Sequence, residues 1–216
     1  MTQTKLVLLD CDSTLSAIEG IDELARLRGD ATFAEVEAMT RAAMEGGAAM
    51  ESVFAKRLDL IRPTYSELES IGAKYIAHVE PSALATISEL QREQWTVVIV
   101  SGGFTQAIRP LADHLGIERV EAVSLQFDGH GNYTGFHPES PTALTRGKNV
   151  VAKRLRSEFQ ASKMVMVGDG ASDLEVQGDV DFVVGFGGYA VRERVKAGAD
   201  AFIHRLSELP TILKQL

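Results

Sequence analysis

The fold of this chain is decided by Leu6-Val-Leu-Leu-Asp10-Cys-Asp12-Ser-Thr14, close to the amino terminus. Its four apolar residues are consecutive rather than alternating, which is typical of a strand buried on both faces of a parallel sheet. Two carboxylates follow directly, at the point where that strand must end. Ligands of open α/β sheets bind just beyond the carboxyl ends of the strands, so Asp10 and Asp12 are candidate functional residues.

Short apolar runs of the same kind recur along the chain and predict the rest of the sheet. They lie at residues 97–100, 164–167 and 182–184, with shorter candidates at 121–124 and 201–203. The first two end in polar residues, Ser101 and Asp169, just as the run at 6–9 ends in Asp10. We therefore expect an α/β fold with a parallel sheet, in which three polar strand ends meet at one crevice.

A long helical segment interrupts the predicted sheet after its first strand. More than 80 residues separate the run at 6–9 from the run at 97–100, far more than one crossover helix needs. Apolar residues recur there at helical spacing, as in Ile18, Ile21, Leu24 and Leu27. The sequence predicts a helical cap over residues 17–78 and an α/β core formed by residues 1–16 and 79–216.

Two smaller elements complete the predicted architecture. Helical periodicity over residues 81–92 predicts the crossover helix, with Pro81 at its first position. Alternation around Asp128-Gly129 and Gly131-Asn132 predicts a β-hairpin. We expect this hairpin to form a small flap beside the core.

The pair Asp10 and Asp12 suits the hydrolysis of a phosphate ester. An ionised Asp10 held by a metal would attack phosphorus, because the acyl phosphate that forms is itself readily hydrolysed. Asp12 would protonate the leaving alcohol and later take a proton from water. The same two residues also fit a structural role, as a helix N-cap and an acidic first turn, and the motif alone leaves both interpretations open.

Ser101-Gly102-Gly103 and Lys148 are candidates for phosphate binding. The glycines would let backbone N–H groups approach a phosphate near a helix start, and the serine hydroxyl would add a donor. Lys148 opens the helical run 149–156 and would neutralise a phosphoryl oxygen, although a lysine at a helix start is more often solvated surface.

Gly168-Asp169-Gly-Ala-Ser-Asp173 is a candidate metal site. Its two carboxylates follow a buried strand, where an unpartnered carboxylate would be costly. Mg²⁺ prefers oxygen ligands and offsets the repulsion between a carboxylate nucleophile and a phosphate dianion. The sequence therefore predicts Mg²⁺ as the cofactor.

Taken in this order along the chain, the motifs resemble the haloacid dehalogenase superfamily. A finer set is similar to the phosphoserine phosphatase family within it, from about residue 5 to residue 210. These finer motifs are Asp10-x-Asp12-Ser-Thr14 followed by Glu19-Gly-Ile-Asp-Glu-Leu-Ala, Met39-Thr-Arg-x-Ala-Met44 with Gly46, Arg57-Leu-x-Leu-Ile-x-Pro63, Ser101-Gly-Gly-Phe104, Pro141-Thr142, Gly168-Asp-Gly-Ala-x-Asp-Leu-Glu175 and Gly185-Phe-Gly-Gly188. The resemblance implies a Rossmann-like core with a helical cap.

The resemblance also implies an activity, the hydrolysis of O-phospho-L-serine to serine and phosphate through a phosphoaspartyl intermediate, the last step of serine biosynthesis. It makes Asp10 the nucleophile and Asp12 the acid/base. It assigns Mg²⁺ to Asp10, the backbone carbonyl of Asp12 and Asp169, with Asp173 in support. It assigns the phosphate to Ser101, Gly102, Gly103 and Lys148, and the rest of the substrate to Glu19, Met44, Gly46 and Arg57. Glu19 would face the substrate ammonium and Arg57 its carboxylate.

Two positions depart from the family pattern. Met50 stands where the cap usually has an aromatic residue that helps to close the pocket, and Val123 stands where Asn usually precedes the hairpin. Neither change touches the predicted catalytic set.

Other functions fit parts of the pattern. A phosphatase of another small phosphomonoester such as phosphohomoserine, or a phosphotransferase, would share the core motifs and differ only in the cap. A phospho-accepting receiver domain also has a strand-end Asp with a nearby Lys, but it needs neither Asp12 nor a helical cap. An inactive scaffold is disfavoured because every catalytic position is filled.

Composition narrows the class of partner. The net charge is −8 and no Lys/Arg run occurs, which disfavours nucleic acid and anionic membranes as partners. Cys11 is the only cysteine, so no intramolecular disulfide can form. The first apolar run is too short for a signal peptide or a membrane span. We expect a cytoplasmic enzyme of a small-molecule substrate, as a monomer or homodimer.

Overall fold

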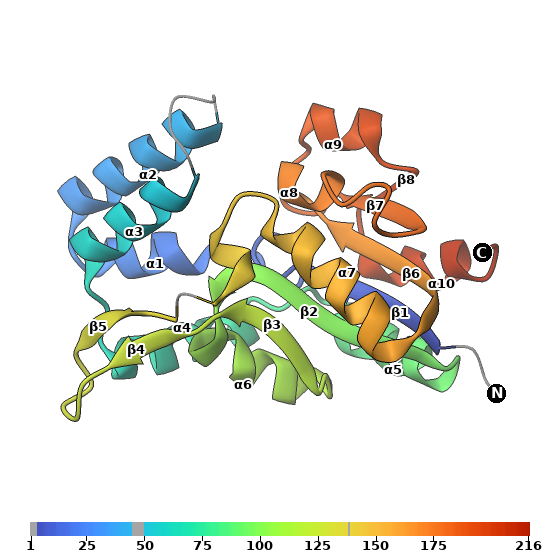
Figure 1. Cartoon of the computed structure of the whole chain (residues 1–216), viewed down its shortest axis with the longest axis horizontal. Coiled ribbons are helices and arrows are strands. Elements are labelled where there is room, and N and C mark those ends of the chain that lie inside the picture. Colours follow the sequence, from blue (N-terminus) through green and yellow to red (C-terminus); the bar gives the residue numbers. More distant parts are fainter. Residues whose placement is uncertain (1–3, 45–49, 138) are drawn as a thin grey trace.

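A six-stranded parallel sheet forms the centre of the molecule (Figure 1). The computed structural model describes residues 4–44, 50–137 and 139–216. The strand order is β3-β2-β1-β6-β7-β8, and every neighbouring pair is parallel. The strands are β1 (Thr4–Leu9), β2 (Trp95–Phe104), β3 (Arg119–Val123), β6 (Ala161–Gly168), β7 (Phe182–Phe186) and β8 (Ala201–Ile203). The predicted α/β fold with a parallel sheet is confirmed.

Strand β1 shows why its apolar run is unbroken. Val7 and Leu9 belong to one apolar cluster, while Leu6 and Leu8 belong to a second cluster on the opposite face. The first cluster includes side chains of α5 (Ala83–Arg92), α6 (Thr105–Leu115) and α10 (Leu209–Leu213), and the second includes side chains of α7 (Gly147–Phe159). Each such side chain contributes roughly 1.5–3 kcal/mol when fully buried, so both faces hold β1 in the middle of the sheet.

The segment between β1 and α5 forms four helices in its described residues. They are α1 (Gly20–Arg26), α2 (Asp30–Met44), α3 (Met50–Ile61) and α4 (Tyr65–Ala77). Helices α2 and α3 pack side by side, away from the sheet, at the upper left of Figure 1. Helix α4 instead packs on α6, where a Cβ at Gly72 would lie only 2.9 Å from the ring of Pro110. The helical insert after the first strand is confirmed, whereas the domain boundaries at residues 17 and 78 stay a prediction.

Two connecting segments join the insert to the core, and they lie side by side. The amide of Ala17 donates to the carbonyl of His78 at 3.0 Å, and the amide of Glu80 donates to the carbonyl of Leu15 at 2.8 Å. Ser16 and Val79 form an antiparallel bridge between these bonds. We refer to residues 15–17 and 78–80 as the neck, because the chain both enters and leaves the insert here.

The predicted hairpin is present as β4 (Leu125–Phe127) and β5 (Tyr133–Phe136), which pair antiparallel. Its tip lies against the start of α4, where the amide of Tyr65 donates to the carbonyl of Gly131 at 2.9 Å. Its other end meets α3, because the rings of Phe54 and Phe136 pack edge to face with centroids 5.4 Å apart. The hairpin therefore contacts the inserted helices.

Three predicted boundaries were wrong by a few residues. The crossover helix α5 begins at Ala83 and not at Pro81, because Ser82 occupies the N-cap position. The third strand spans 119–123 and not 121–124. Strand β2 continues through the glycine pair to Phe104, since Phe104 still pairs with Val123 of β3.

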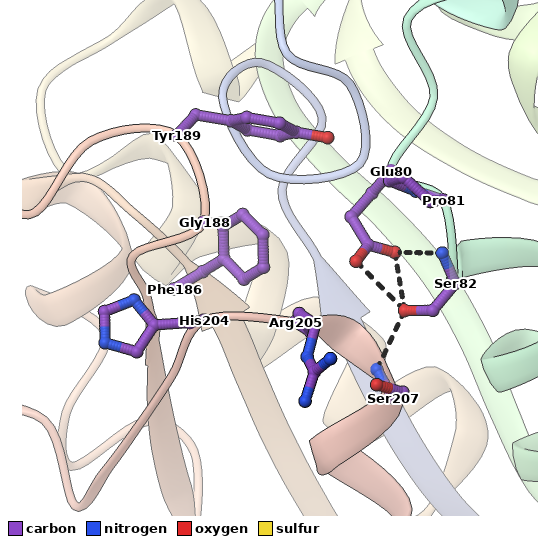
Figure 2. A pocket seen from close by; sticks show the side chains of 9 residues that line it. All are labelled: Glu80, Pro81, Ser82, Phe186, Gly188, Tyr189, His204, Arg205 and Ser207. Carbon is purple, nitrogen blue, oxygen red and sulfur yellow. Dashed lines mark hydrogen bonds between the residues drawn. The ribbon is translucent and has the colours of Figure 1, made fainter.

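A buried carboxylate fastens the start of α5 to the carboxyl-terminal part of the chain (Figure 2). Glu80 accepts hydrogen bonds from the Ser82 amide at 2.8 Å, the Ser82 hydroxyl at 2.7 Å and the Leu206 amide at 3.3 Å. It forms one wall of a hollow of about 400 Å³ that is also lined by Tyr189 and Arg205. Because both carboxylate oxygens of Glu80 are already hydrogen-bonded by the protein, its role is structural.

The helices that the structure describes include none that is long and apolar enough to span a membrane.

Candidate active site

Asp10 and Lys148 form the centre of the site. Asp10 directly follows β1 and is 8% exposed, and one of its carboxylate oxygens, Oδ1, accepts the Cys11 amide at 2.8 Å. The Nζ atom of Lys148, at the start of α7, lies 2.9 Å from the same oxygen and 2.6 Å from Oδ1 of Asp173. Lys148 is 6% exposed, so it is not solvated surface. Burial by itself would lower the pKa of Lys148, but Asp10 and Asp173 outweigh burial and raise it, which keeps the lysine charged.

Three carboxylates converge beside this pair. Asp169 directly follows β6, and Asp173 lies on the short helix α8 (Ala171–Leu174). Ligand oxygens of Asp10, Asp169 and Asp173 all lie within 4.8 Å of one another, and all three residues are buried. Burial raises the pKa of Asp169, and burial together with the charge of Asp10 raises the pKa of Asp173 to about 8. A group of hard oxygen donors under this mutual repulsion fits a divalent cation.

Within the group, the carboxylates are not equally free to bind a cation. Asp173 is engaged on both oxygens, by Lys148 and by the Gly170 amide at 3.0 Å. A Cβ at Gly168 would lie 2.2 Å from the carboxyl carbon of Asp173, so only glycine leaves room for it there. This arrangement suits the supporting role predicted for Asp173.

Arg192 is a member of the site that the sequence analysis missed. Its Nε and Nη2 atoms each lie 2.8 Å from Oδ2 of Asp169. It precedes α9 (Glu193–Gly198), in the loop that follows β7. That position beyond a strand end of the parallel sheet is the only signal in the sequence that could have pointed to it.

The two carboxylate oxygens of Asp12 differ in their hydrogen bonds, with two short bonds to Oδ1 and one long bond to Oδ2. Its Oδ1 accepts the Tyr75 hydroxyl at 2.5 Å and the Gly20 amide at 2.7 Å. Its Oδ2 accepts the hydroxyl of Ser101 at 3.4 Å. Burial and the charge of Asp10 raise the pKa of Asp12 to about 6. An N-cap with an acidic first turn does not describe this site, because no helix begins between residues 4 and 19.

The segment Ser101–Gly103 faces Asp12 from the end of β2. The Ser101 hydroxyl oxygen is buried and accepts the Gly103 amide at 2.9 Å. A Cβ at Gly103 would lie 2.8 Å from Oδ2 of Asp12, so a side chain here would displace the carboxylate. Gly102 is exposed. The ends of β2, β1 and β6, which are neighbours in the sheet, thus bring Ser101, Asp10 and Asp169 to one place.

The insert contributes one acidic and one basic side chain, Glu19 and Arg57, that lie near each other. Glu19 precedes α1 and accepts the Ser13 hydroxyl at 2.7 Å, while burial and the charge of Asp12 raise its pKa to about 8. Arg57 of α3 is 8% exposed and donates from Nη1 to the hydroxyl of Thr40 at 3.0 Å. Its buried Nε has no hydrogen-bond partner among the described residues. Arg57 is therefore not a surface charge, and it has donors left for a ligand.

Three of the residues singled out in the sequence lie beyond this description. Gly46 and the side chains of Met44 and Met50 fall outside the described part of the structure. The predicted contacts of Met44 and Gly46 with the substrate stay predictions.

Comparison with known proteins agrees with this geometry. The family model of haloacid dehalogenase-like hydrolases matches residues 7–176. Phosphoserine phosphatase of Homo sapiens is 38% identical over 207 residues, 94% of this chain and 90% of the human one. Phosphoserine phosphatase of Methanocaldococcus jannaschii is 31% identical over 98% of this chain and 97% of its own.

Solved structures agree as well. One described as a phospho-aspartyl intermediate analogue of phosphoserine phosphatase superposes with a TM-score of 0.80 at 30% identity and covers 100% of both chains. A phosphoserine phosphohydrolase-like protein from Francisella tularensis has a TM-score of 0.86 at 21% identity, which shows the shared fold. Both the sequence and the fold therefore match over nearly the whole length. The chain belongs to the phosphoserine phosphatase family of haloacid dehalogenase-like hydrolases.

Proposed function

We propose that this chain hydrolyses O-phospho-L-serine to serine and inorganic phosphate, with Mg²⁺ as cofactor. The observation that carries the proposal is the buried strand-end Asp10, 2.9 Å from Lys148 and grouped with Asp169 and Asp173. Relatives that are 31–38% identical over nearly the full chain and are named phosphoserine phosphatase support the choice of substrate.

Asp10 is the nucleophile. Its carboxylate attacks phosphorus as the ester P–O bond breaks, and the phosphoryl group becomes attached to Asp10. Lys148 stays charged beside it and neutralises a phosphoryl oxygen. The Ser101 hydroxyl and the backbone amide of Gly102 offer further hydrogen bonds to the same group, near the end of the neighbouring strand, and the Gly103 amide donates to the Ser101 hydroxyl oxygen.

Asp12 moves the proton in both halves of the reaction. As the ester bond breaks, its carboxyl group gives a proton to the departing serine oxygen. Water then attacks the phosphoaspartyl group, and the same carboxylate takes a proton from that water, so Asp12 ends as it began. A buried carboxyl group whose pKa is raised to about 6 is suited to alternate between these two forms.

The donor set fits Mg²⁺. Asp10 and Asp169 would hold it with the backbone carbonyl of Asp12, while Asp173 would support them through its contact with Lys148. When bound, Mg²⁺ offsets the negative charge of the phosphate and of the carboxylate that attacks it. All of these ligands are oxygen atoms, as Mg²⁺ requires.

Glu19 and Arg57 read the rest of the substrate. A phosphorylated amino acid carries one ammonium and one carboxylate a few ångströms apart, so it needs one anion and one cation at a matching spacing. Arg57 has an unpartnered buried Nε, and an arginine binds a carboxylate with two hydrogen bonds. Asp22 and, to a smaller extent, Glu19 lie close enough to Arg57 to oppose the fall of its pKa that burial causes.

A substrate panel tests the proposal. Phosphate release is measured from O-phospho-L-serine, O-phosphohomoserine and 4-nitrophenyl phosphate, with Mg²⁺ and with EDTA. We expect the highest kcat/KM on O-phospho-L-serine and no turnover in EDTA. A higher kcat/KM on O-phosphohomoserine would make that ester the preferred substrate, while the proposed mechanism at Asp10 and Asp12 would still hold. Full activity in chelated protein would refute the metal role of Asp10 and Asp169.

A further inference from the structure

A buried hydroxyl group next to Asp12 has no role in the mechanism above. Tyr75 lies on α4, is 0% exposed and donates its phenol hydrogen to Oδ1 of Asp12 at 2.5 Å. The Gly20 amide donates to the same oxygen at 2.7 Å. Two donors therefore point at Oδ1, and a proton on that oxygen would face both of them.

The other carboxylate oxygen of Asp12 faces the catalytic side. Among the described residues, Oδ2 accepts one hydrogen bond, a long one of 3.4 Å from Ser101. A Cβ at Gly103 would lie 2.8 Å from Oδ2, which places this oxygen beside the phosphate-binding segment. The two oxygens of one carboxyl group thus have different surroundings.

We propose that Tyr75 is the positioning residue for the acid/base Asp12, holding Oδ1 together with the Gly20 amide so that only Oδ2 exchanges the proton with the substrate. The inference rests on the proposed function, in which Asp12 is the acid/base. The proton leaves Oδ2 for the serine oxygen as the P–O bond breaks. It returns to Oδ2 from the water that attacks the phosphoaspartyl group.

The phenol group is itself fixed in place. Helix α4 packs closely on α6 through Gly72 and Pro110, and the carbonyl of Tyr75 accepts the hydroxyl of Ser16 at 3.1 Å. A Cβ at Gly20 would lie 2.2 Å from the phenol oxygen, so the ring and the chain at Gly20 are in close contact. A hydroxyl group held this firmly restricts rotation of the Asp12 carboxyl group, which a water molecule would not.

The variant Tyr75→Phe keeps the ring and removes only the hydroxyl group. Two substrates with different leaving groups distinguish a positioning role of Tyr75 from a general loss of structure. The alkoxide of phosphoserine needs a proton as it departs, whereas 4-nitrophenolate is a stable anion that does not. The parameter to compare is kcat/KM, because it covers the steps up to formation of the phosphoaspartyl group. We expect Tyr75→Phe to lower kcat/KM for phosphoserine about 10- to 100-fold and for 4-nitrophenyl phosphate less than about threefold.

Tyr133→Phe is the matched control. Tyr133 is also a buried tyrosine, at 6% exposure, but it lies on the hairpin and its hydroxyl group has no hydrogen-bond partner in the described part of the chain. This variant should leave kcat/KM unchanged for both substrates. Thermal unfolding of both variants shows whether the fold is retained.

A double-mutant cycle with Asp12→Asn completes the test. If Tyr75 acts only through Asp12, adding Tyr75→Phe to Asp12→Asn causes no further loss with phosphoserine. Equal losses on both substrates, no loss at all, or additive losses in the double variant would overturn the role of Tyr75. Asp12→Asn alone must also lower kcat/KM for phosphoserine more than kcat/KM for 4-nitrophenyl phosphate. If it is not, the acid role of Asp12 in the proposed function fails, and this inference fails with it.

Discussion

At the scale of single residues, Asp10 is held on Oδ1 by the Cys11 amide and Lys148. Asp10→Asn should lower phosphate release by about 10⁴-fold or more, because an amide is not a nucleophile for phosphorus. Its melting temperature should not fall, since the change removes one charge from a cluster of buried carboxylates. Steady-state turnover and thermal unfolding check the two parts, and turnover near the wild-type rate would refute the mechanism.

Arg57 is the residue on which substrate choice should depend. Arg57→Ala should lower kcat/KM for phosphoserine about 100-fold or more, because the substrate carboxylate would be buried without a partner. The value for 4-nitrophenyl phosphate, which lacks that carboxylate, should change less than about threefold.

The matched control for Arg57 is Lys56→Ala, an exposed neighbour on the same helix. It should leave both substrates unaffected. Equal losses on both substrates in Arg57→Ala would mean that Arg57 supports the inserted helices and does not read the substrate.

Residues whose role follows from a local motif could be predicted from the sequence. Asp10, Ser101 and Asp169 each end an apolar run, so the parallel sheet alone brings them together. Tyr75 and Arg192 were missed, because they reach their partners across 63 and 23 positions of the chain. Nothing near Tyr75 in the sequence distinguishes it from an ordinary helix residue, and the only signal for Arg192 is its position beyond the end of β7.

At the scale of elements, unbroken runs of Val, Leu and Met located the strands, since few other elements of that length are buried on both faces. The end of β2 was missed because glycine usually marks a turn, whereas here pairing of Phe104 with Val123 prolongs the strand. The start of α5 was missed because Ser82 takes the N-cap position after Pro81. Register and capping depend on partners that a local pattern does not contain.

Arg28 and Glu67 join the ends of three inserted helices. Arg28, just after α1, donates to both oxygens of Glu67 at 2.6 Å and to the carbonyl of Ile61, the last residue of α3. Glu67 in turn accepts the amide of Thr64, the N-cap of α4. The contact with Arg28 lowers the pKa of Glu67 below its ordinary value of 4.5, and the amide bond adds to this.

Glu67→Gln should therefore destabilise the protein by about 0.5–1 kcal/mol at pH 7, because glutamine still accepts the Thr64 amide and only the ion pair with Arg28 is lost. Because the folded state lowers the pKa of Glu67, this contribution is fully present above about pH 4.5 and is lost as the pH falls through the lowered pKa. Urea unfolding of wild type and variant from pH 7 to pH 3 should show a constant difference that shrinks below pH 4.5. Glu69→Gln, an exposed residue on the same helix, should show no difference at any pH.

At the scale of the whole molecule, the site concentrates negative charge in the middle of the fold. Asp10, Asp12, Asp169 and Asp173 are all buried or nearly so, with Lys148 and Arg192 as their positive neighbours. Mg²⁺ at about 100 times its Kd should stabilise the fold by about 2.7 kcal/mol. For a chain of 216 residues this raises Tm by roughly 5–10 °C.

Differential scanning calorimetry with and without Mg²⁺ checks this increase. Asp169→Asn should abolish it, whereas Asp128→Asn, an exposed hairpin residue, should retain it. Ca²⁺ should also raise Tm but support turnover poorly, because it prefers more ligands at longer distances. An equal Tm with and without Mg²⁺ would show that the acidic group does not bind the ion.

The neck described above has a consequence for how such proteins diverge. Residues 15–17 and 78–80 of the neck are hydrogen-bonded to each other, so the two ends of the insert are held together. The core therefore has the same attachment point whatever the length of the insert. Helices α1–α3 can therefore be exchanged between relatives. Helix α4 cannot, because it packs on α6 and carries Tyr75. A chimera that takes residues 20–62 from a relative with another substrate should fold and acquire the donor's preference. If the exchange also includes α4, the chimera should neither fold nor acquire the donor's substrate preference.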